Sequence, residues 1–407
     1  MAAIHDTTRV KDHRGDFPQH KSEFLIEVTD PVKQGEGVAA YVVYKVNSYL
    51  VEGSVQKKYA QVTRRFRDFS SLYDRLVDKN KGLIVPALPE KNAVQKFSMS
   101  TEFIEQRRKA LQTFINKAAI HPGLKDTAEL REFLQADDQT WAIEVSQWQN
   151  EASAYAGQLS SAVQWLKTLS YSAQSLVSSA TGRTSANDDI TEDPEYLKIR
   201  EYITGLESKL GEAHRQAKHL AQREQEMSAA LADFGEAADA LGRFDDGALR
   251  TTLSQLHTKL SQLADKSRHR SEQLTIRLEA PLKEMSRTLK AAKKAMDGRA
   301  NSLSMFAMAK SDLESKKSRV SRLESIPGTK PEKIEEANRE VMVADQRLQN
   351  AQFGFKQIKD VMKDELTRVQ RERALELAQL LRDFAVDQAN YAAEQADVWY
   401  SFIEAVN

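Results

Sequence analysis

The feature that most constrains this chain's fold is a very long stretch of helical periodicity that begins at Pro194. Beyond that residue the only prolines are Pro281, Pro327 and Pro331. Uninterrupted helices of such length extend on the order of 100 Å at 1.5 Å per residue, so a single small domain cannot bury them. They have to pack against one another and against another copy or a relative of the chain.

Breaks in this stretch predict three long helices. The first is expected at Pro194–Gly242, where an FDDG turn follows, and the second at about Gly247–Ser325. A bend is expected at Pro281, because its ring does not fit a straight helix. The IPGTKP segment, Ile326–Pro331, predicts a reversal, after which the third helix occupies about Glu332–Ala405.

In the first third of the chain, apolar residues recur at every second position over several segments instead of at helical spacing. Residues 1–21 are polar and are expected to form a flexible tail. Alternating apolar residues then predict three strands joined by short turns, an antiparallel meander. The third strand ends at TRRFRDF, Thr63–Phe69, where the spacing becomes helical and Asp68 is placed to cap a helix. The following LIVPALPEK segment, Leu83–Lys91, contains two prolines and is expected to form an extended loop, the proline loop.

Two more helices complete this first unit. One is expected at about Thr101–Ala119, followed by His121 in an ordinary C-terminal capping role. Its apolar spacing directs four residues inward, Phe103, Leu111, Phe114 and Ile115. A short helix at about Thr127–Leu134 closes a compact domain that covers residues 22–138.

The TRRFRDF segment is dense in chemistry that binds anions. A planar guanidinium can make two parallel contacts to a phosphate, and a lysine supplies a point charge for a second phosphate. In an isolated Arg-Arg pair, surface pairing with nearby acids would be the ordinary explanation. Here a ring at Phe66, a proline loop and a second Arg-Arg pair at Arg107 and Arg108 accompany Arg64 and Arg65. Together they favour a site for a phosphate headgroup.

These segments closely resemble the phox-homology (PX) domain of sorting nexins. The motifs RRFRDF, LPEK, FIEQRRKALQTFINKAAIHP and ELREFLQ occur in the family's order over residues 22–138. The resemblance implies that the domain binds phosphatidylinositol 3-phosphate. It also implies roles for Arg65 on the 3-phosphate and for Phe66 beneath the inositol ring, where the family more often has tyrosine. Phenylalanine keeps the stacking and lacks the hydroxyl contact.

The resemblance assigns the remaining contacts to residues farther along the chain. Lys91 is expected to contact the 1-phosphate and Arg107 the hydroxyls of the inositol ring. Arg64 and Arg108, each adjacent to a site residue, are expected to support the site.

Residues 139–193 have a different composition, rich in Ser, Ala and Gln, and predict a linker that contains an amphipathic helix. Its polar face is nearly uncharged, so the helix can either pack against a neighbour as ordinary core or lie among lipid headgroups. Its place before the long helices favours the membrane, and Trp165 suits an interface position. The residues expected to insert are Leu159, Val163, Trp165, Leu166, Leu169 and Leu176.

The chain has 59 Lys and Arg residues and 59 Asp and Glu residues, so attraction to a polyanion has to be local. Residues 283–333 contain thirteen basic and six acidic residues, a surplus of seven. Anionic lipid attracts such residues by about 1 kcal/mol each. A solvated helix with salt bridges to the third helix is the alternative, and both are expected. The residues expected to face lipid are Lys316, Lys317, Arg319, Arg322 and Lys330.

Residues 194–407 resemble the BAR domain of sorting nexins. The segment LADFGEAADALG, Leu231–Gly242, is similar to the family's most recognisable helical motif, and PGTKPEKI lies where the family has its tip loop. The whole chain therefore resembles the retromer-associated, plant-like sorting nexins of the PX-BAR class. This resemblance implies an α+β PX domain with a three-stranded antiparallel sheet, followed by an all-α domain of three long helices that forms a curved dimer.

The function implied is that of a peripheral protein on the cytosolic face of endosomes, with the trans-Golgi network as an alternative location. It would bind phosphatidylinositol 3-phosphate and anionic membrane. It would form a homodimer, or a heterodimer with another sorting nexin, and sense or generate tubules during protein sorting. Association with the retromer core is also implied, and no cofactor, metal or nucleic acid is expected.

Other classes of protein fit the sequence less well. Cysteine is absent, which excludes disulfides and thiolate chemistry. A run of about 18 apolar residues and a secretory signal are also lacking, so the chain is expected to reach membranes only peripherally. No GxxxxGK[ST], HExxH or GxSxG motif occurs, and we expect no enzyme. The rival interpretation is a cytosolic coiled-coil scaffold with a basic face for protein or nucleic acid, which would leave RRFRDF and LPEK without a role.

Overall fold

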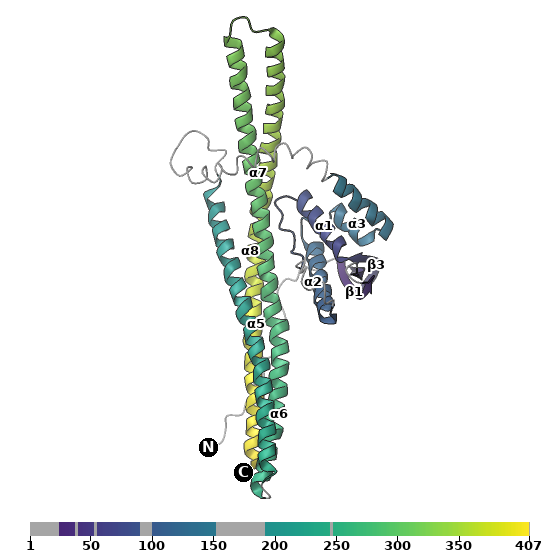
Figure 1. Cartoon of the computed structure of the whole chain (residues 1–407), viewed down its shortest axis with the longest axis vertical. Coiled ribbons are helices and arrows are strands. Elements are labelled where there is room, and N and C mark those ends of the chain that lie inside the picture. The colour runs from purple at the N-terminus through teal and green to yellow at the C-terminus, as the bar shows by residue number, and fades with distance from the viewer. Residues whose placement is uncertain are drawn as a thin grey trace. The chain divides into compact units, whose positions relative to one another are not determined.

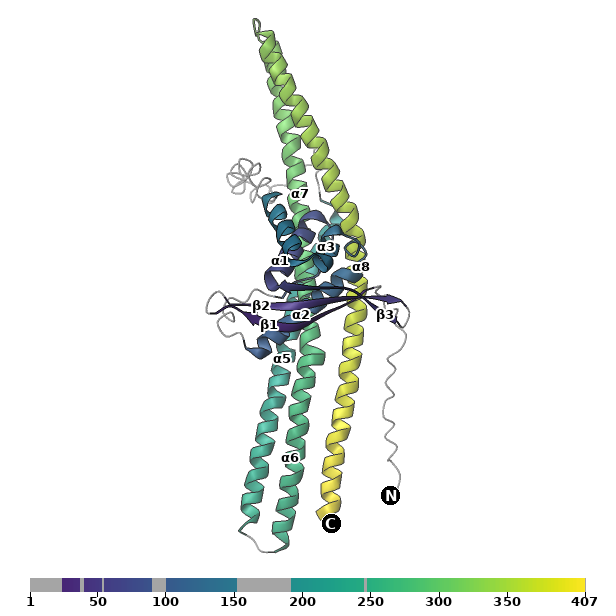
Figure 2. The same cartoon turned by 90° about the vertical axis from the view of Figure 1, so that its right-hand side faces the viewer.

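The computed structural model describes residues 24–36, 40–52, 55–89, 100–151, 192–244 and 247–406. By their contacts these residues form two compact units. The first contains residues 199–290 and 366–406, and the second contains the described residues of 24–198 and 291–365. Figures 1 and 2 show the helices and strands with their labels. The expected tail, residues 1–21, lies outside the described residues.

The predicted meander is confirmed in the second unit. Strands β1 (Phe24–Gln34), β2 (Tyr41–Glu52) and β3 (Val55–Arg65) form one antiparallel sheet in that order. Val46 lies opposite Val28 on one side and Val62 on the other, so the apolar residues of all three strands share a face. That face is buried against helices, as the alternating sequence predicts.

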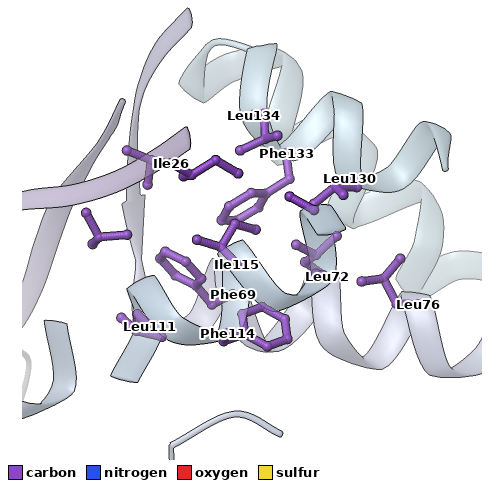
Figure 3. Close-up of a cluster of buried hydrophobic side chains, with 14 of the residues drawn as sticks. Ile26, Phe69, Leu72, Leu76, Leu111, Phe114, Ile115, Leu130, Phe133 and Leu134 are labelled. Carbon is purple, nitrogen blue, oxygen red and sulfur yellow. The ribbon is translucent and has the colours of Figure 1, made fainter. Parts of the chain in front are cut away.

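Three helices cover the sheet: α1 (Phe66–Lys79), α2 (Thr101–Ile120) and α3 (Ala128–Gln135). Each contributes apolar residues at helical spacing to one core, and the ring centres of Phe69 and Phe133 are 4.8 Å apart in an edge-to-face contact. Figure 3 shows these side chains converging, with Ile26 of the sheet on one side of the cluster and Leu72, Leu111, Ile115 and Leu130 contributed by the helices.

The core continues beyond Asp138, where the first domain was expected to end. Another helix begins at residue 138 and is described through residue 151. Its start is capped by Asp137, whose carboxylate accepts the Thr140 N–H at 2.8 Å. Trp141 and Trp148 of this helix are buried in the same core, because two large rings seven residues apart lie on one helical face.

The free edge of β1 is covered by polar side chains of α2. Asn116 accepts the Ile26 N–H at 3.2 Å and donates to the Ile26 carbonyl at 2.6 Å. Gln112 accepts the Val28 N–H at 3.0 Å. The backbone groups of this edge strand are therefore paired although no fourth strand adjoins β1 in the described sheet.

In the second unit, the later part of α7 (Ala280–Ser325) and the first part of α8 (Pro331–Val406) meet at the predicted reversal. Figure 1 shows both helices running to the loop that joins them. Gly328 has φ +86°, a conformation that favours glycine, and Thr329 donates its N–H to the Ile326 carbonyl at 3.4 Å. Farther along the pair, the rings of Phe306 and Phe355 stack with centres 6.3 Å apart.

In the first unit, α5 (Pro194–Gly242) and α6 (Ala248–Leu274) pack closely where Gly235 faces α6. A Cβ atom built at Gly235 would lie 3.2 Å from His257 Nδ1. Near Pro281, where a bend was expected, a π-helical turn, η4 (Thr275–Glu279), lies directly before α7. A wider turn gives the proline ring room over the preceding carbonyls, so the chain absorbs the proline without ending the helical run.

Every long helix in the described part of the chain is amphipathic or polar. None of the helices described is long and apolar enough to cross a bilayer.

Candidate functional site

The first expected site residue, Arg65, stands where β3 ends and α1 begins. Its backbone N–H donates to Asp68 Oδ2 at 2.8 Å, so the acid predicted to cap the helix fixes the strand-to-helix turn. The Arg65 side chain is 44% exposed, with Nε 3.7 Å from Asp68 Oδ1. An exposed guanidinium with one loose surface ion pair remains available to an anionic ligand.

Arg65 also lines a groove of about 380 Å³ between the sheet and the helix that begins at residue 138. Its guanidinium carbon lies 5.6 Å from the ring centre of Tyr41 in this groove. Arg67 and Trp141 line the groove as well. Among the described contacts, none joins the Arg65 side chain to Arg107.

Phe66 and Arg107 lie in contact with each other. The Arg107 guanidinium carbon lies 4.6 Å from the ring centre of Phe66 and 4.3 Å from that of Phe103. Burial lowers the pKa of Arg107, and nearby Tyr44 acts in the opposite direction. Two rings thus hold one guanidinium by cation–π contact. Phe103 was expected to point into the core with Leu111, but it is half-buried and contacts Arg107, which spacing alone did not indicate.

Arg64, expected to support the headgroup site, lies inside the domain. Its Nε donates to the Phe133 carbonyl at 3.1 Å and its Nη2 to the Ala136 carbonyl at 2.5 Å. The guanidinium carbon lies 5.4 Å from the ring centre of Phe133 and 5.0 Å from that of Trp141. Burial lowers the pKa of Arg64 to about 10, although Asp68, Asp138 and Asp137 favour the charged form. Arg64 therefore joins the end of α3 to β3.

Arg108, the other residue expected to support the headgroup site, also stabilises the fold. Its Nη1 donates to the Val28 carbonyl at 2.6 Å, and its Nε and Nη2 contact the two carboxylate oxygens of Glu105 at 2.8 and 2.6 Å. This pairing lowers the pKa of Glu105. The Arg108 guanidinium is therefore occupied at the edge of β1.

The proline loop is described only up to Pro89. Its first part is anchored, because Ile84 and Val85 are buried. Lys91 lies outside the described residues, as do the six residues expected to insert into a membrane, Leu159, Val163, Trp165, Leu166, Leu169 and Leu176.

The residues of the expected basic surface differ in their surroundings. Lys316 Nζ lies 3.1 Å from Asp312 on the same helix, and Arg319 Nη1 lies 2.8 Å from Glu340 of α8. Lys317, Arg322 and Lys330 are at least partly exposed. Both outcomes expected from the sequence, salt bridges and exposed cations, thus occur in α7 and the loop after it.

The first unit exposes an apolar stripe on α5. Met227, Phe234 and Leu241 each expose more than half of their surface. They are spaced seven residues apart, so they lie on one face of the helix. A repeated apolar stripe of this kind is typical of a helix that packs against another helix.

No group of three or more His, Asp or Glu side chains within the described part of the chain is placed to hold a metal ion.

Comparison with known families agrees with the fold. A model described as "Vps5 C terminal like" matches residues 170–405, and a model described as "PX domain" matches residues 53–137. The first match spans more than half of the chain. The chain therefore belongs to the sorting nexins that join a PX domain to a BAR-type helical domain.

The chain is similar to individual members along nearly its whole length. It is 34% identical to Sorting nexin 1 of Arabidopsis thaliana over 387 residues, which cover 95% of this chain and 93% of that protein. It is 27% identical to Sorting nexin-1 of Mus musculus over 395 residues, 94% of this chain and 71% of that protein. Among solved structures, the SNX-BAR Mvp1 tetramer has a similar fold, with a TM-score of 0.66 and 14% identity over 93% of this chain and 99% of that one.

Proposed function

We propose that the chain binds phosphatidylinositol 3-phosphate on endosomal membranes and shapes those membranes during protein sorting. The observation that carries the proposal is the exposed Arg65 at the start of α1, next to the Phe66 ring that holds Arg107. Arg65 would pair with the 3-phosphate, Phe66 would lie beneath the inositol ring and Arg107 would contact its hydroxyls. Lys91, on the proline loop, would contact the 1-phosphate.

A vesicle flotation experiment tests this proposal. The full chain is mixed with phosphatidylcholine vesicles with or without phosphatidylinositol 3-phosphate. The chain should float only with the phosphoinositide, and Arg65→Ala should weaken binding at least about tenfold. Arg131→Ala removes an equally charged, exposed side chain from α3 and serves as the matched control. If the unaltered chain ignores the vesicles, the scaffold interpretation is favoured instead.

The helices after Pro194 would supply avidity. The apolar stripe on α5 would pair two copies, or this chain and another sorting nexin, so that each assembly presents two headgroup sites.

Lys317, Arg322 and Lys330 would contact anionic lipid, with smaller contributions from Lys316 and Arg319, because acids already pair with these two. The amphipathic segment with Trp165 would insert among headgroups. This role needs no catalysis, and the retromer core is the partner that it suits.

Electron microscopy of liposomes tests the membrane-shaping part. Liposomes that carry phosphatidylinositol 3-phosphate should become tubular at high coverage by the full chain. Liposomes that stay spherical at saturating coverage would contradict membrane remodelling and leave headgroup binding intact.

A further inference from the structure

One buried carboxylate on α8 holds two segments of the PX domain. Glu365 is 5% exposed, and its Oε1 lies 2.7 Å from His121 Nε2 and 3.1 Å from the backbone nitrogen of Ile84. The residues belong to the same compact unit. His121 comes directly after α2, the helix that carries Arg107, and Ile84 begins the proline loop.

The proton on His121 can be assigned from its second nitrogen. The Gly123 N–H donates to His121 Nδ1 at 3.1 Å, so Nδ1 is an acceptor and the proton of the neutral ring is on Nε2. The ring therefore donates to Glu365, and so does Ile84. A buried carboxylate needs such donors, since its desolvation would otherwise favour the unfolded chain or the neutral acid.

The loop also approaches α8 closely through its backbone. Gly82 has φ +97°, and a Cβ atom at this position would lie 3.1 Å from the Ile358 carbonyl oxygen and 3.3 Å from Val361 Cγ1. Ile358 and Glu365 are seven residues apart and share a face of α8 with Val361 nearby. Gly82 and Ile84 therefore contact α8 at positions about two turns apart.

The position of this joint, the contacts of Glu365 with His121 and Ile84, matters because both segments that it holds lead into the proposed site. Pro86 and Pro89 restrict the backbone of the proline loop beyond Ile84. The α2 helix carries Arg107. An anchor at the start of the loop and at the end of α2 therefore limits how both segments can move against α8.

We infer that Glu365 is a positioning residue for the headgroup site: it fixes the proline loop and the end of α2 against α8, and so sets the geometry in which the site binds its ligand. The inference rests on the proposed headgroup function. It makes a residue of the helical domain part of the lipid specificity of the PX domain, although this residue would never touch the lipid.

The test compares binding of soluble short-chain phosphatidylinositol 3-phosphate to full-length variants by calorimetry. Glu365→Leu should weaken binding about tenfold, whereas Glu365→Gln, which keeps an oxygen acceptor at the same place, should retain most of it. Gly82→Ala disturbs the same joint from the loop side and should also weaken binding. Amide exchange at Ile84 should accelerate in Glu365→Leu and Gly82→Ala while exchange in the sheet core stays unchanged, which shows that both variants are folded.

The outcomes separate the two proposals. If the unaltered chain does not bind the soluble lipid, the proposed headgroup function fails. If it binds, and Glu365→Leu loosens the Ile84 amide yet binds as tightly as the unaltered chain, Glu365 is a structural contact only and the inference is overturned.

Discussion

Arg64 and Arg65 are neighbours in the sequence, yet their guanidinium groups lie in opposite surroundings. The Arg64 side chain is fully buried and donates to the carbonyls of Phe133 and Ala136, whereas the Arg65 side chain is 44% exposed beside Tyr41. Successive residues of a strand point to opposite faces, which explains the difference. One arginine completes the domain and the other is left for a ligand.

We therefore expect the two arginines to respond differently to alanine. Arg64→Ala leaves buried carbonyls without their donor and should lower the free energy of unfolding by about 3 kcal/mol. Arg65→Ala should change it by no more than about 0.5 kcal/mol, because the side chain is 44% exposed and its ion pair with Asp68 is loose. Urea unfolding of both variants measures the difference. Equal stability of the two variants would contradict the assignment of Arg64 to the fold.

The contact between Phe66 and Arg107 predicts that lipid binding depends on an aromatic ring at position 66. Phe66→Leu removes the π-face and should weaken binding of soluble phosphatidylinositol 3-phosphate about fivefold, equivalent to about 1 kcal/mol. Phe66→Tyr keeps the ring and should bind at least as well as the unaltered chain. Calorimetry provides the measurement, and equal affinity of the leucine and tyrosine variants would argue against stacking.

The stripe on α5 predicts how the chain associates. Replacing both Phe234 and Leu241 by aspartate puts charges into an apolar contact and should shift the chain from the mass of two copies to that of one. The same double change at Met342 and Phe353, which are exposed on α8, serves as the matched control. Light scattering after size exclusion gives the masses. A double variant that stays at the mass of two chains would show that α5 is not the contact.

Tyr44 predicts a change in stability at high pH. Burial raises the pKa of Tyr44 to about 12 against a small opposing effect of Arg107. The folded chain thus holds the phenolic proton more tightly than the unfolded chain, whose value is 10.0. This stabilising contribution is complete below pH 10 and is lost as the pH rises through 12.

Tyr44→Phe removes the titrating group and should flatten the fall in unfolding free energy between about pH 10 and pH 12. Arg64 acts in the opposite direction in this range, since its folded-state pKa is lowered, but the unaltered chain and the variant share this effect. Urea unfolding at several pH values compares the two slopes. The same slope in both proteins would mean that Tyr44 does not titrate as its burial requires.

Local patterns in the sequence were sufficient to predict most of the fold. Alternation indicated the three strands, and the Pro-Gly reversal at Ile326–Pro331 is present. Asp68 stabilises the start of α1 as expected, but the helix begins earlier than Asp68, at Phe66, with Arg65 as its N-cap. The same alternation in β3 also indicates that the Arg64 side chain points into the domain. Val62 and Arg64 are two apart in β3, so a buried Val62 places Arg64 on the inward face.

Other parts of the site depend on contacts between distant residues. Nothing near Glu365 in the sequence indicates that it accepts from His121, because 244 residues separate the pair. His121 was expected only to cap α2. Trp148 likewise looks like part of a linker until the helix that carries it packs on the core. Periodicity identifies an inward face, and it does not identify the surface that this face meets.

The side chains that cover the edge of β1 affect how neighbouring molecules can pair when they are crowded. Asn116, Gln112 and Arg108 occupy both backbone groups of Ile26 and of Val28. A strand from a neighbouring molecule thus finds no unpaired N–H or carbonyl at these two residues, and the sheet cannot extend there from copy to copy. Many molecules can therefore accumulate side by side without their sheets joining through this part of β1.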